Sequence, residues 1–411
     1  MTFPVDDIRQ RFPSLQTAGP FIFFDNAAGA QVPGSVVDAV TDHLLHRNVQ
    51  RGGPYRRSRD VDAMIASARD SVAAFVNARS SDEIAFGLNA TSFIRAISLG
   101  IGYTLAPADE ESRIEIVVSE LDHEANIATW LALERLGARI IWWRVGDDGR
   151  LHTRELEPLL GPRTRLVACT VATNATGTLV DVTSVARLAH AVGAEVFLDA
   201  VHYAPHGPID VQGWACDYLV CSGYKVFAPH MGFAWCRRES INRLPTFREH
   251  FIPDVTPDKL EAGTYVYENV AGMAAAIGYL ETLGDGPTRR ERLSLAMTRI
   301  AEYERTLSQT LLTEIGGLRG VRVYGMTDAA RLAERVPTLA FSVDGRSASF
   351  IAEALASHDI GVRSGHMYSP RLIAHLGRAD DGVVRASLVH YNTVDEIARF
   401  RAALAEIIDR G

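Results

Sequence analysis

The sequence has few cysteines, no long apolar run and no excess of basic residues. Four cysteines among 411 residues show neither CxxC spacing nor the density of a disulfide scaffold, so we expect buried thiols and a reducing, cytoplasmic location. No window approaches the ~18 consecutive apolar residues of a membrane span, and the N-terminal residues do not form a secretory signal. The 42 basic and 50 acidic residues give a formal net charge of −8. This balance argues against a dedicated nucleic-acid-binding protein, so neither nucleic acid nor membrane is an expected partner.

Short apolar runs alternate with helical patterns between about residues 80 and 237. Strands are predicted at 83–88, 114–120, 138–145, 164–172, 194–201, 217–223 and 232–238. Because the runs are short and rich in Val and Ile, they favour a mainly parallel sheet with helices on both faces over a set of buried helices. Residues 266–310 look largely helical, and the strand and helix patterns after them predict a smaller α+β domain. The segment 244–259 has no clear period and is predicted to be a loop or lid.

Lys225 follows an apolar strand that ends in Ser222-Gly223. A buried lysine is costly unless it is paired or neutral, and a neutral amine is what Schiff-base chemistry requires. On this evidence alone, a lysine that extends its ammonium to solvent remains equally open. Asp199 ends the apolar run AEVFLD, where α/β sheets place ligands, although a turn or N-cap role would also explain it. Together they are the pair that a pyridoxal phosphate (PLP) site needs: a lysine for the aldehyde and a carboxylate for the pyridine nitrogen.

Two further strand ends carry polar residues. Asn89-Ala90-Thr91 opens an apolar helix pattern, and free N–H groups with a hydroxyl at a helix start suit a phosphate. Asn and Thr are also routine N-caps, so this signal is weak by itself. His123 follows the strand around 114–120 and is placed to lie on a cofactor ring, while the alternative is a structural hydrogen-bonding role.

The order of these motifs resembles the class V aminotransferase family, the branch of fold-type I PLP enzymes that contains cysteine desulfurases and selenocysteine lyases. The resemblance rests on FFDNAAGAQVP (23–33), NAT (89–91), SELDHEANIATW (119–130), TNATGT (173–178), LDAVHYAPHG (198–207), SGYK (222–225), EAGT (261–264), VRSGH (362–366) and VRASLVHYNT (384–393). It implies a large PLP-binding domain over 21–265 with a mainly parallel seven-stranded sheet. An N-terminal segment, 1–20, would pack near a small α+β domain, which with a linking helix occupies 266–411. It also implies a homodimer with a shared active site.

The resemblance also implies roles for single residues. Lys225 would form the Schiff base with PLP, Asp199 would pair with the pyridine nitrogen, and His123 would stack on the ring. Phosphate and ring contacts would come from Ala90, Thr91, Asn174, His202 and Ser222, and from Thr264 across the dimer interface. Arg385 would bind the α-carboxylate of an amino-acid substrate, with Arg363, Tyr368 and Asn26 in the same substrate site.

Three departures from the family pattern affect the predicted chemistry. Tyr368 stands where group II cysteine desulfurases carry their persulfide-forming cysteine, and no cysteine follows Cys236. A phenol cannot accept sulfur as a thiolate does. His202 replaces a common Gln, so we expect a side chain whose charge changes near neutral pH. Tyr224 precedes Lys225 where better-known members have His.

We therefore expect a PLP-dependent enzyme that acts on an amino acid or an amino-acid conjugate. The leading hypothesis is a C–S or related β-lyase that forms no enzyme persulfide. An aminotransferase or a racemase or epimerase is the alternative, and a non-catalytic PLP-binding scaffold is the second alternative. Arg51, Arg56, Arg57 and Arg59 form either a solvated helix-start cluster or a subsite for an acidic substrate side chain.

Overall fold

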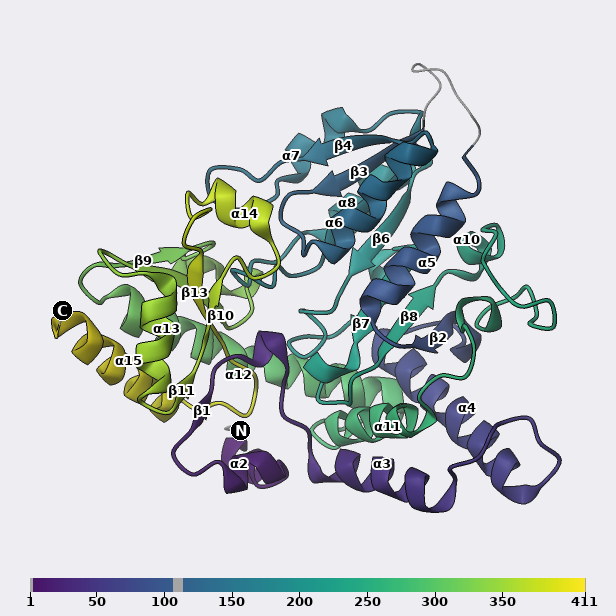
Figure 1. Cartoon of the computed structure of the whole chain (residues 1–411), viewed down its shortest axis with the longest axis horizontal. Helices are drawn as coiled ribbons and strands as arrows, with labels where there is room; N and C mark the ends of the chain where they lie inside the picture. Colours follow the sequence, from purple (N-terminus) through teal and green to yellow (C-terminus); the bar gives the residue numbers. More distant parts are fainter. Residues whose placement is uncertain (1–2, 106–113, 411) are drawn as a thin grey trace.

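The computed structural model, which describes residues 3–105 and 114–410, is organised around a seven-stranded sheet (Figure 1). In spatial order the strands are β2 (Ile84–Gly87), β8 (Gly232–Cys236), β7 (Tyr218–Ser222), β6 (Glu195–Asp199), β5 (Thr164–Thr170), β3 (Glu115–Ser119) and β4 (Arg139–Trp143). Six of these strands run in one direction, and β8 runs antiparallel to both of its neighbours, β2 and β7. The predicted mainly parallel sheet is confirmed, and each of the seven predicted runs contains one of these strands.

Both faces of this sheet are apolar because successive side chains point to opposite sides. In β3, Val117 packs into one core, whereas Ile116 and Val118 pack into the core on the other face. One core takes apolar side chains from α5 (Ala90–Gly102) and from Trp130 of α6 (Ala125–Leu131). The other takes them from α4 (Arg56–Val76), α8 (Val182–Ala191), α11 (Tyr267–Glu281) and Val36 of α3 (Gly34–His46). This arrangement explains why the strands read as continuous apolar runs.

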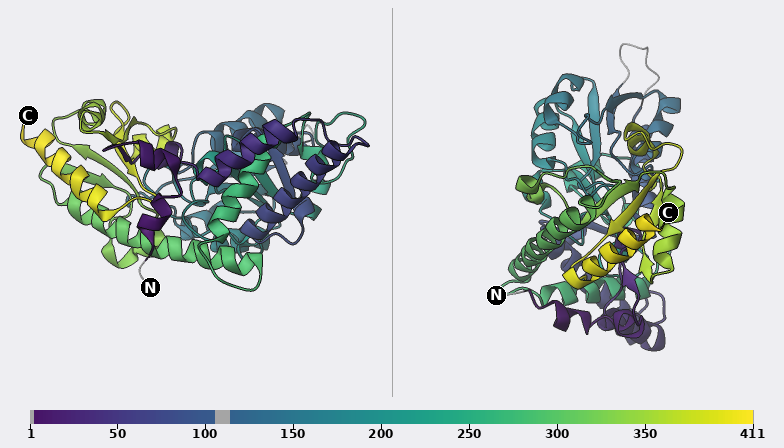
Figure 2. Two further views of the ribbon diagram at one scale, coloured as in Figure 1. Left: turned by 90° about the horizontal axis from the view of Figure 1, so that it is seen from below. Right: turned by 90° about the vertical axis from the view of Figure 1, so that its left-hand side faces the viewer.

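A second, antiparallel sheet lies toward the C-terminus. Its order is β12 (Arg363–Gly365), β13 (Val383–Ser387), β10 (Thr338–Val343) and β9 (Val321–Tyr324). It packs with α13 (Ala348–Ala356), α15 (Val394–Asp409) and the long α12 (Arg289–Gly316), which also contacts α4 and so joins the two parts of the molecule (Figure 2). The shorter helices are α1 (Val5–Arg9), α2 (Pro13–Thr17), α7 (Thr153–Leu156), α9 (Val211–Trp214), α10 (Arg238–Asn242) and α14 (Pro370–His375).

The chain near residue 22 lies against the C-terminal sheet rather than the large one. β1 (Ile22–Phe23) pairs in parallel with β11 (Ile360–Gly361), and an isolated bridge joins Asp25 to Ser387. Ile22 and Phe24 accordingly belong to the C-terminal core. The predicted domain boundaries remain a prediction, but this pairing places Asp25 at the junction of the two sheets.

The N-terminal helices also contact the end of the chain. Arg9 forms an ion pair of 2.9 Å with Glu396 of α15 and donates a hydrogen bond to the carbonyl oxygen of Tyr391. The ring of Phe12 packs against Tyr391 and Phe227. None of the described helices is long and apolar enough to cross a membrane.

A buried ion pair anchors α4 to the edge of the large sheet. Arg69 of α4 lies 2.7 Å from Glu261, whose other carboxylate oxygen accepts a hydrogen bond from the backbone N–H of Phe86 in β2. Arg69 also donates to the carbonyl oxygen of Ile84. Both charged side chains are almost fully buried, so each depends on the other for compensation.

We expect Glu261→Gln to lower the free energy of unfolding by about 3–5 kcal/mol, because the Arg69 charge would stay buried without its counterion. Urea denaturation measures the change. Asp82→Asn is the matched control, because it breaks the exposed ion pair with Arg238 and should cost no more than about 1 kcal/mol. Equal losses in the two variants would contradict this account of the Arg69 pair.

Candidate active site

A small cavity of about 50 Å³ opens at the carboxyl ends of β5, β6 and β7. Asp199 is the last residue of β6, Ser222 is the last of β7, and Lys225 follows in a short 3-10 turn. Parallel strands end at the same edge of a sheet, which brings these side chains together. Eight of the predicted cofactor residues line the cavity: Ala90, Thr91, His123, Asn174, Asp199, His202, Ser222 and Lys225.

The amine of Lys225 is buried in this cavity, with only 6% of the residue exposed. Burial and, to a smaller extent, the nearby Arg385 lower its pKa to about 8, although the carboxylates of Asp199 and Asp25 act in the opposite direction. A lowered pKa increases the fraction of neutral, nucleophilic amine near neutral pH. The sequence contains only one other lysine, Lys259, whose Nζ is held by the carbonyl oxygen of Leu244 at 2.8 Å.

Asp199 faces the same cavity from the neighbouring strand. Its Oδ1 accepts a hydrogen bond of 2.9 Å from the backbone N–H of Val201. Burial raises the pKa of this carboxyl, while the hydrogen bond and Lys225 act in the opposite direction. A buried carboxyl with one engaged oxygen is suited to bind a cationic ring N–H, which would restore its charged form.

The N-terminus of α5 forms one wall of the cavity. Asn89 caps this helix by accepting a hydrogen bond of 2.9 Å from the N–H of Ser92, so Ala90 and Thr91 form its first turn. Ser222 lies beside that turn, where its hydroxyl accepts a bond of 3.4 Å from the N–H of Ala90. β8 can lie this close to the start of α5 because Gly232 has no side chain. A Cβ at this position would lie 2.5 Å from the carbonyl carbon of Asn89. The free N–H groups and hydroxyls favour an anion such as phosphate.

Two histidines line the cavity, and both are neutral at neutral pH. Burial, Lys225 and Arg385 lower the pKa of His123 to about 4, and its Nδ1 accepts a hydrogen bond from the N–H of Ala125. His202 lies 3.0 Å from the hydroxyl of Thr338, and burial lowers its pKa well below the usual value. The expectation that His202 changes charge near neutral pH is therefore wrong, because desolvation disfavours the cationic ring.

Arg385 and Arg363 are both predicted to bind the carboxylate of the substrate. In the structure both contact the side chain of Asp25, a residue that the sequence analysis did not identify. Arg385 Nη2 donates to Asp25 Oδ1 at 2.8 Å, and Arg363 Nη2 lies 2.7 Å from Asp25 Oδ2. Arg385 also donates to the carbonyl oxygen of Asn174. Asp25 belongs to the FFDNAA motif, but nothing in its local sequence indicates a partner on β12 or β13.

The side chains of Asn174 and Asn26 are engaged by other residues. Asn174 donates to the carbonyl oxygen of Met367 at 2.6 Å and accepts from the hydroxyl of Ser369, so it holds the loop that carries Tyr368. Asn26 donates to the carbonyl oxygens of Phe23 and Ser387 and accepts from the Tyr391 hydroxyl. These bonds join the early chain to β13 and the segment after it, and Asn26 is not among the residues that line the cavity, so its role in binding substrate stays a prediction.

Tyr368 is 55% exposed, and its ring stacks on that of the cavity-lining His123 at a centroid distance of 5.5 Å. Its φ is +57° and that of Met367 is +53°, a left-handed conformation that non-glycine residues rarely adopt. The backbone N–H of Glu124 donates to the carbonyl oxygen of Tyr368 at 2.8 Å. These contacts hold the loop against the site wall.

Thr264 and the arginine cluster lie outside the cavity lining. Thr264 is exposed and accepts a hydrogen bond from Gln50, so its role in a second subunit's site stays a prediction. In the cluster, Arg51 pairs with Asp62. Each of the other three guanidinium groups also has a local partner: Arg56 with Asp60, Arg57 with the carbonyl oxygen of His46, and Arg59 with that of Pro54. This favours the solvated helix-start cluster over a substrate subsite.

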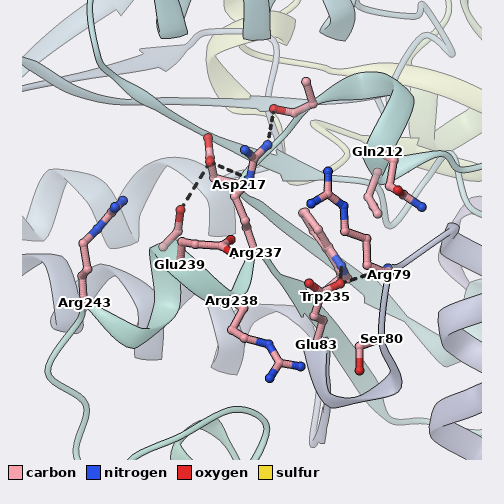
Figure 3. Close-up of a pocket in the computed structure, with 13 residues that line it drawn as sticks. Arg79, Ser80, Glu83, Gln212, Asp217, Trp235, Arg237, Arg238, Glu239 and Arg243 are labelled. Carbon is pink, nitrogen blue, oxygen red and sulfur yellow. Dashed lines mark hydrogen bonds and ion pairs between the residues drawn. The ribbon is translucent and has the colours of Figure 1, made fainter.

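A larger cavity, of about 610 Å³, lies at the opposite edge of the sheet (Figure 3). Its two buried carboxylates are already engaged. Asp217 pairs with Arg237 at 3.1 Å, and Glu83 accepts a hydrogen bond from the indole N–H of Trp235. No lysine or histidine is among the described residues that line it. The smaller cavity therefore carries the groups suited to catalysis.

Comparisons with known proteins identify the family to which the chain belongs. Residues 22–400 match the family described as aminotransferase class-V. The chain is 35% identical over 418 residues to the aminotransferase-like protein FGM3 of Gibberella zeae, covering 99% of each. It is 32% identical over 426 residues to a cysteine desulfurase of Enterobacter sp. strain 638, again covering 99% of each.

Its fold is similar to an apo structure of a cysteine desulfurase from Thermococcus onnurineus NA1. The TM-score is 0.88 with 26% identity, over 100% of this chain and 99% of that one. The match to the family extends over nearly the whole chain. The chain belongs to the class V aminotransferase family, whose members are generally PLP-dependent enzymes.

Proposed function

We propose that this protein is a PLP-dependent enzyme that acts on an amino acid or amino-acid conjugate as a C–S or related β-lyase. The observation that carries the proposal is the meeting of Lys225, Asp199 and the N-terminus of α5 around one buried cavity. These groups fit PLP chemically: an amine of lowered pKa for the aldehyde, a carboxyl for the ring nitrogen, and N–H groups with hydroxyls for the phosphate. When bound, PLP supplies an electron sink for a negative charge that develops at the substrate α-carbon.

Individual residues of the chain would bind the cofactor, remove the α-proton and orient the substrate. Lys225 would hold the cofactor through its aldehyde, and the Nζ of Lys225, as a free amine of lowered pKa, would serve as the base for the substrate α-proton. Asp199 would pair with the ring nitrogen, and the neutral ring of His123 would pack over the cofactor without adding a competing positive charge. Arg385 orients the α-carboxylate, which a planar guanidinium binds with two hydrogen bonds. The homodimer and the cytoplasmic location remain predictions.

The lyase would release its leaving group without an enzyme persulfide. All four cysteines are buried, and burial raises the thiol pKa of each, which keeps the reactive thiolate scarce. Tyr368 occupies the loop position at which the resembling desulfurases carry their nucleophile. A sulfur-containing leaving group would therefore depart as a free small molecule.

The name of one relative, an aminotransferase-like protein, supports a second candidate, transfer of the amino group. The two candidates differ in where the substrate nitrogen goes. A β-lyase releases ammonia and a keto acid in equal amounts, whereas an aminotransferase needs a keto-acid acceptor and releases no ammonia. Assays of both products across a panel of amino acids distinguish them.

Borohydride reduction of the PLP-loaded protein should attach the cofactor to Lys225. Peptide mapping by mass spectrometry identifies the modified residue. Lys259 is the internal control, because it is the only other lysine and its Nζ is bound to Leu244 and Asp254. Lys259→Arg should retain the label and Lys225→Arg should lose it. A label on Lys259 would overturn the assignment of the site.

Asp199→Asn should lower kcat/KM by about 10²–10³-fold while retaining some PLP, because an amide does not stabilise a protonated ring nitrogen. Steady-state kinetics and the cofactor absorption spectrum are measured together. Asp217→Asn is the control, since it neutralises an equally buried carboxylate at the far edge of the sheet and should leave turnover per folded molecule unchanged. Wild-type turnover in Asp199→Asn would show that ring protonation is not used.

Treatment with cysteine should leave no protein-bound persulfide, which intact mass spectrometry would detect as a reducible increment of about 32 Da. Tyr368→Cys is the positive control, because it places an accessible thiol at the family's position and should gain the increment if the protein cleaves a C–S bond. An increment on the unmodified protein, above all on Cys221 beside the site, would refute the proposed release of free sulfur.

A further inference from the structure

Asp25 joins two arginines that are predicted to receive the substrate. Its Oδ1 lies 2.8 Å from Arg385 Nη2, and its Oδ2 lies 2.7 Å from Arg363 Nη2 and 3.0 Å from Arg363 Nε. The carboxylate thus forms a two-point contact with Arg363 and a single contact with Arg385. Arg363 is the more firmly held partner.

The backbone positions Asp25 at this junction. The bridge to Ser387 and the hydrogen bond from the Ser387 N–H to the carbonyl oxygen of Phe24 bring the segment onto β13. Asp25 stands at the N-cap of the turn Asn26–Ala28, yet its side chain makes no capping hydrogen bond. Within the described residues, its carboxylate hydrogen-bonds only to the two arginines.

One N–H group of the Arg385 guanidinium has no hydrogen-bond acceptor among the described residues. Only 2% of its side chain is exposed, so its charge depends on neighbouring groups for stabilisation. Nη1 binds the carbonyl oxygen of Asn174, Nη2 binds Asp25, and Nε is buried without a hydrogen-bond partner among the described residues. Two guanidinium groups share one carboxylate, so the cluster carries one positive charge in excess.

We propose that Asp25 is an internal carboxylate that occupies part of the substrate-carboxylate subsite in the free protein and is displaced from Arg385 when a carboxylate ligand binds. The incoming carboxylate takes Arg385 Nε and Nη2, and Asp25 stays on Arg363 through its two-point contact. Each guanidinium then has its own anion. Asp25 is a positioning residue. Because it remains on Arg363, only Arg385 is free to bind the ligand, and the subsite accepts a single ligand carboxylate.

The identification of the ligand as an amino-acid α-carboxylate rests on the proposed function, whereas the exchange itself does not. Neutralising Asp25 should leave Arg385 buried without a counterion, and a carboxylate from solution should then bind more tightly because it relieves that cost. A residue that only shaped the site would have the opposite effect, since its loss would loosen the arginines and weaken binding.

The test measures acetate binding to the PLP-loaded protein from the thermal unfolding midpoint at constant pH and ionic strength, since a ligand of the folded state raises that midpoint. Asp25→Asn should unfold at a lower temperature than the wild type without acetate and bind acetate about tenfold more tightly. Asp25→Glu keeps the charge and should bind acetate like the wild type. Glu314→Gln removes a carboxylate from the exposed pair with Arg401 and should leave acetate binding unchanged.

Weaker or equal acetate binding in Asp25→Asn would overturn the proposal. Failure of that variant to fold even in acetate would also overturn it, because the added anion should replace the lost carboxylate. The proposed enzymatic function fails separately, if no amino acid changes the cofactor absorption spectrum of the wild-type protein. The acetate measurement does not depend on that result.

Discussion

The burial of the Lys225 amine governs the arrangement of charges around it. An ammonium group removed from water needs either a nearby anion or a pKa low enough to lose its proton. Here Asp199 on β6 and Asp25 at the junction of the sheets favour the charged form, while burial and Arg385 favour the neutral form. The resulting pKa of about 8 lies near the working range of an amine that must act both as a nucleophile and as a base.

The same constraint explains why the site lies between the two sheets. The large sheet supplies Lys225, Asp199 and Ser222 from the ends of parallel strands, and β12 and β13 supply Arg363 and Arg385. A fully buried arginine beside a buried lysine is unfavourable without a compensating carboxylate. The early chain provides it, because β1 pairs with β11 and brings Asp25 between the two arginines.

The loop that carries Tyr368 lies beside the site, where it contacts the cavity-lining residues Asn174 and His123. Asn174 and Glu124 bind its backbone, and two consecutive residues with positive φ show that its conformation is determined by these contacts rather than by local preference. The ring of Tyr368 stacks on that of His123. With every cysteine buried elsewhere, this loop is the main feature that separates the proposed chemistry from persulfide formation.

The sequence by itself determined the large sheet and the core of the site. Continuous apolar runs between amphipathic helices predicted the mainly parallel sheet, and residues at the ends of such runs, including Asp199 and Lys225, necessarily gather at one edge. Only the tertiary structure revealed the position of Asp25, whose arginine partners lie 338 and 360 residues away and which follows a two-residue strand too short to show a period. The neutral state of His202 and the hydrogen bonds of Asn26 to Ser387 and Tyr391 likewise depend on burial and on contacts between distant segments. These depend on how the whole chain packs, and no local pattern of residue types encodes them.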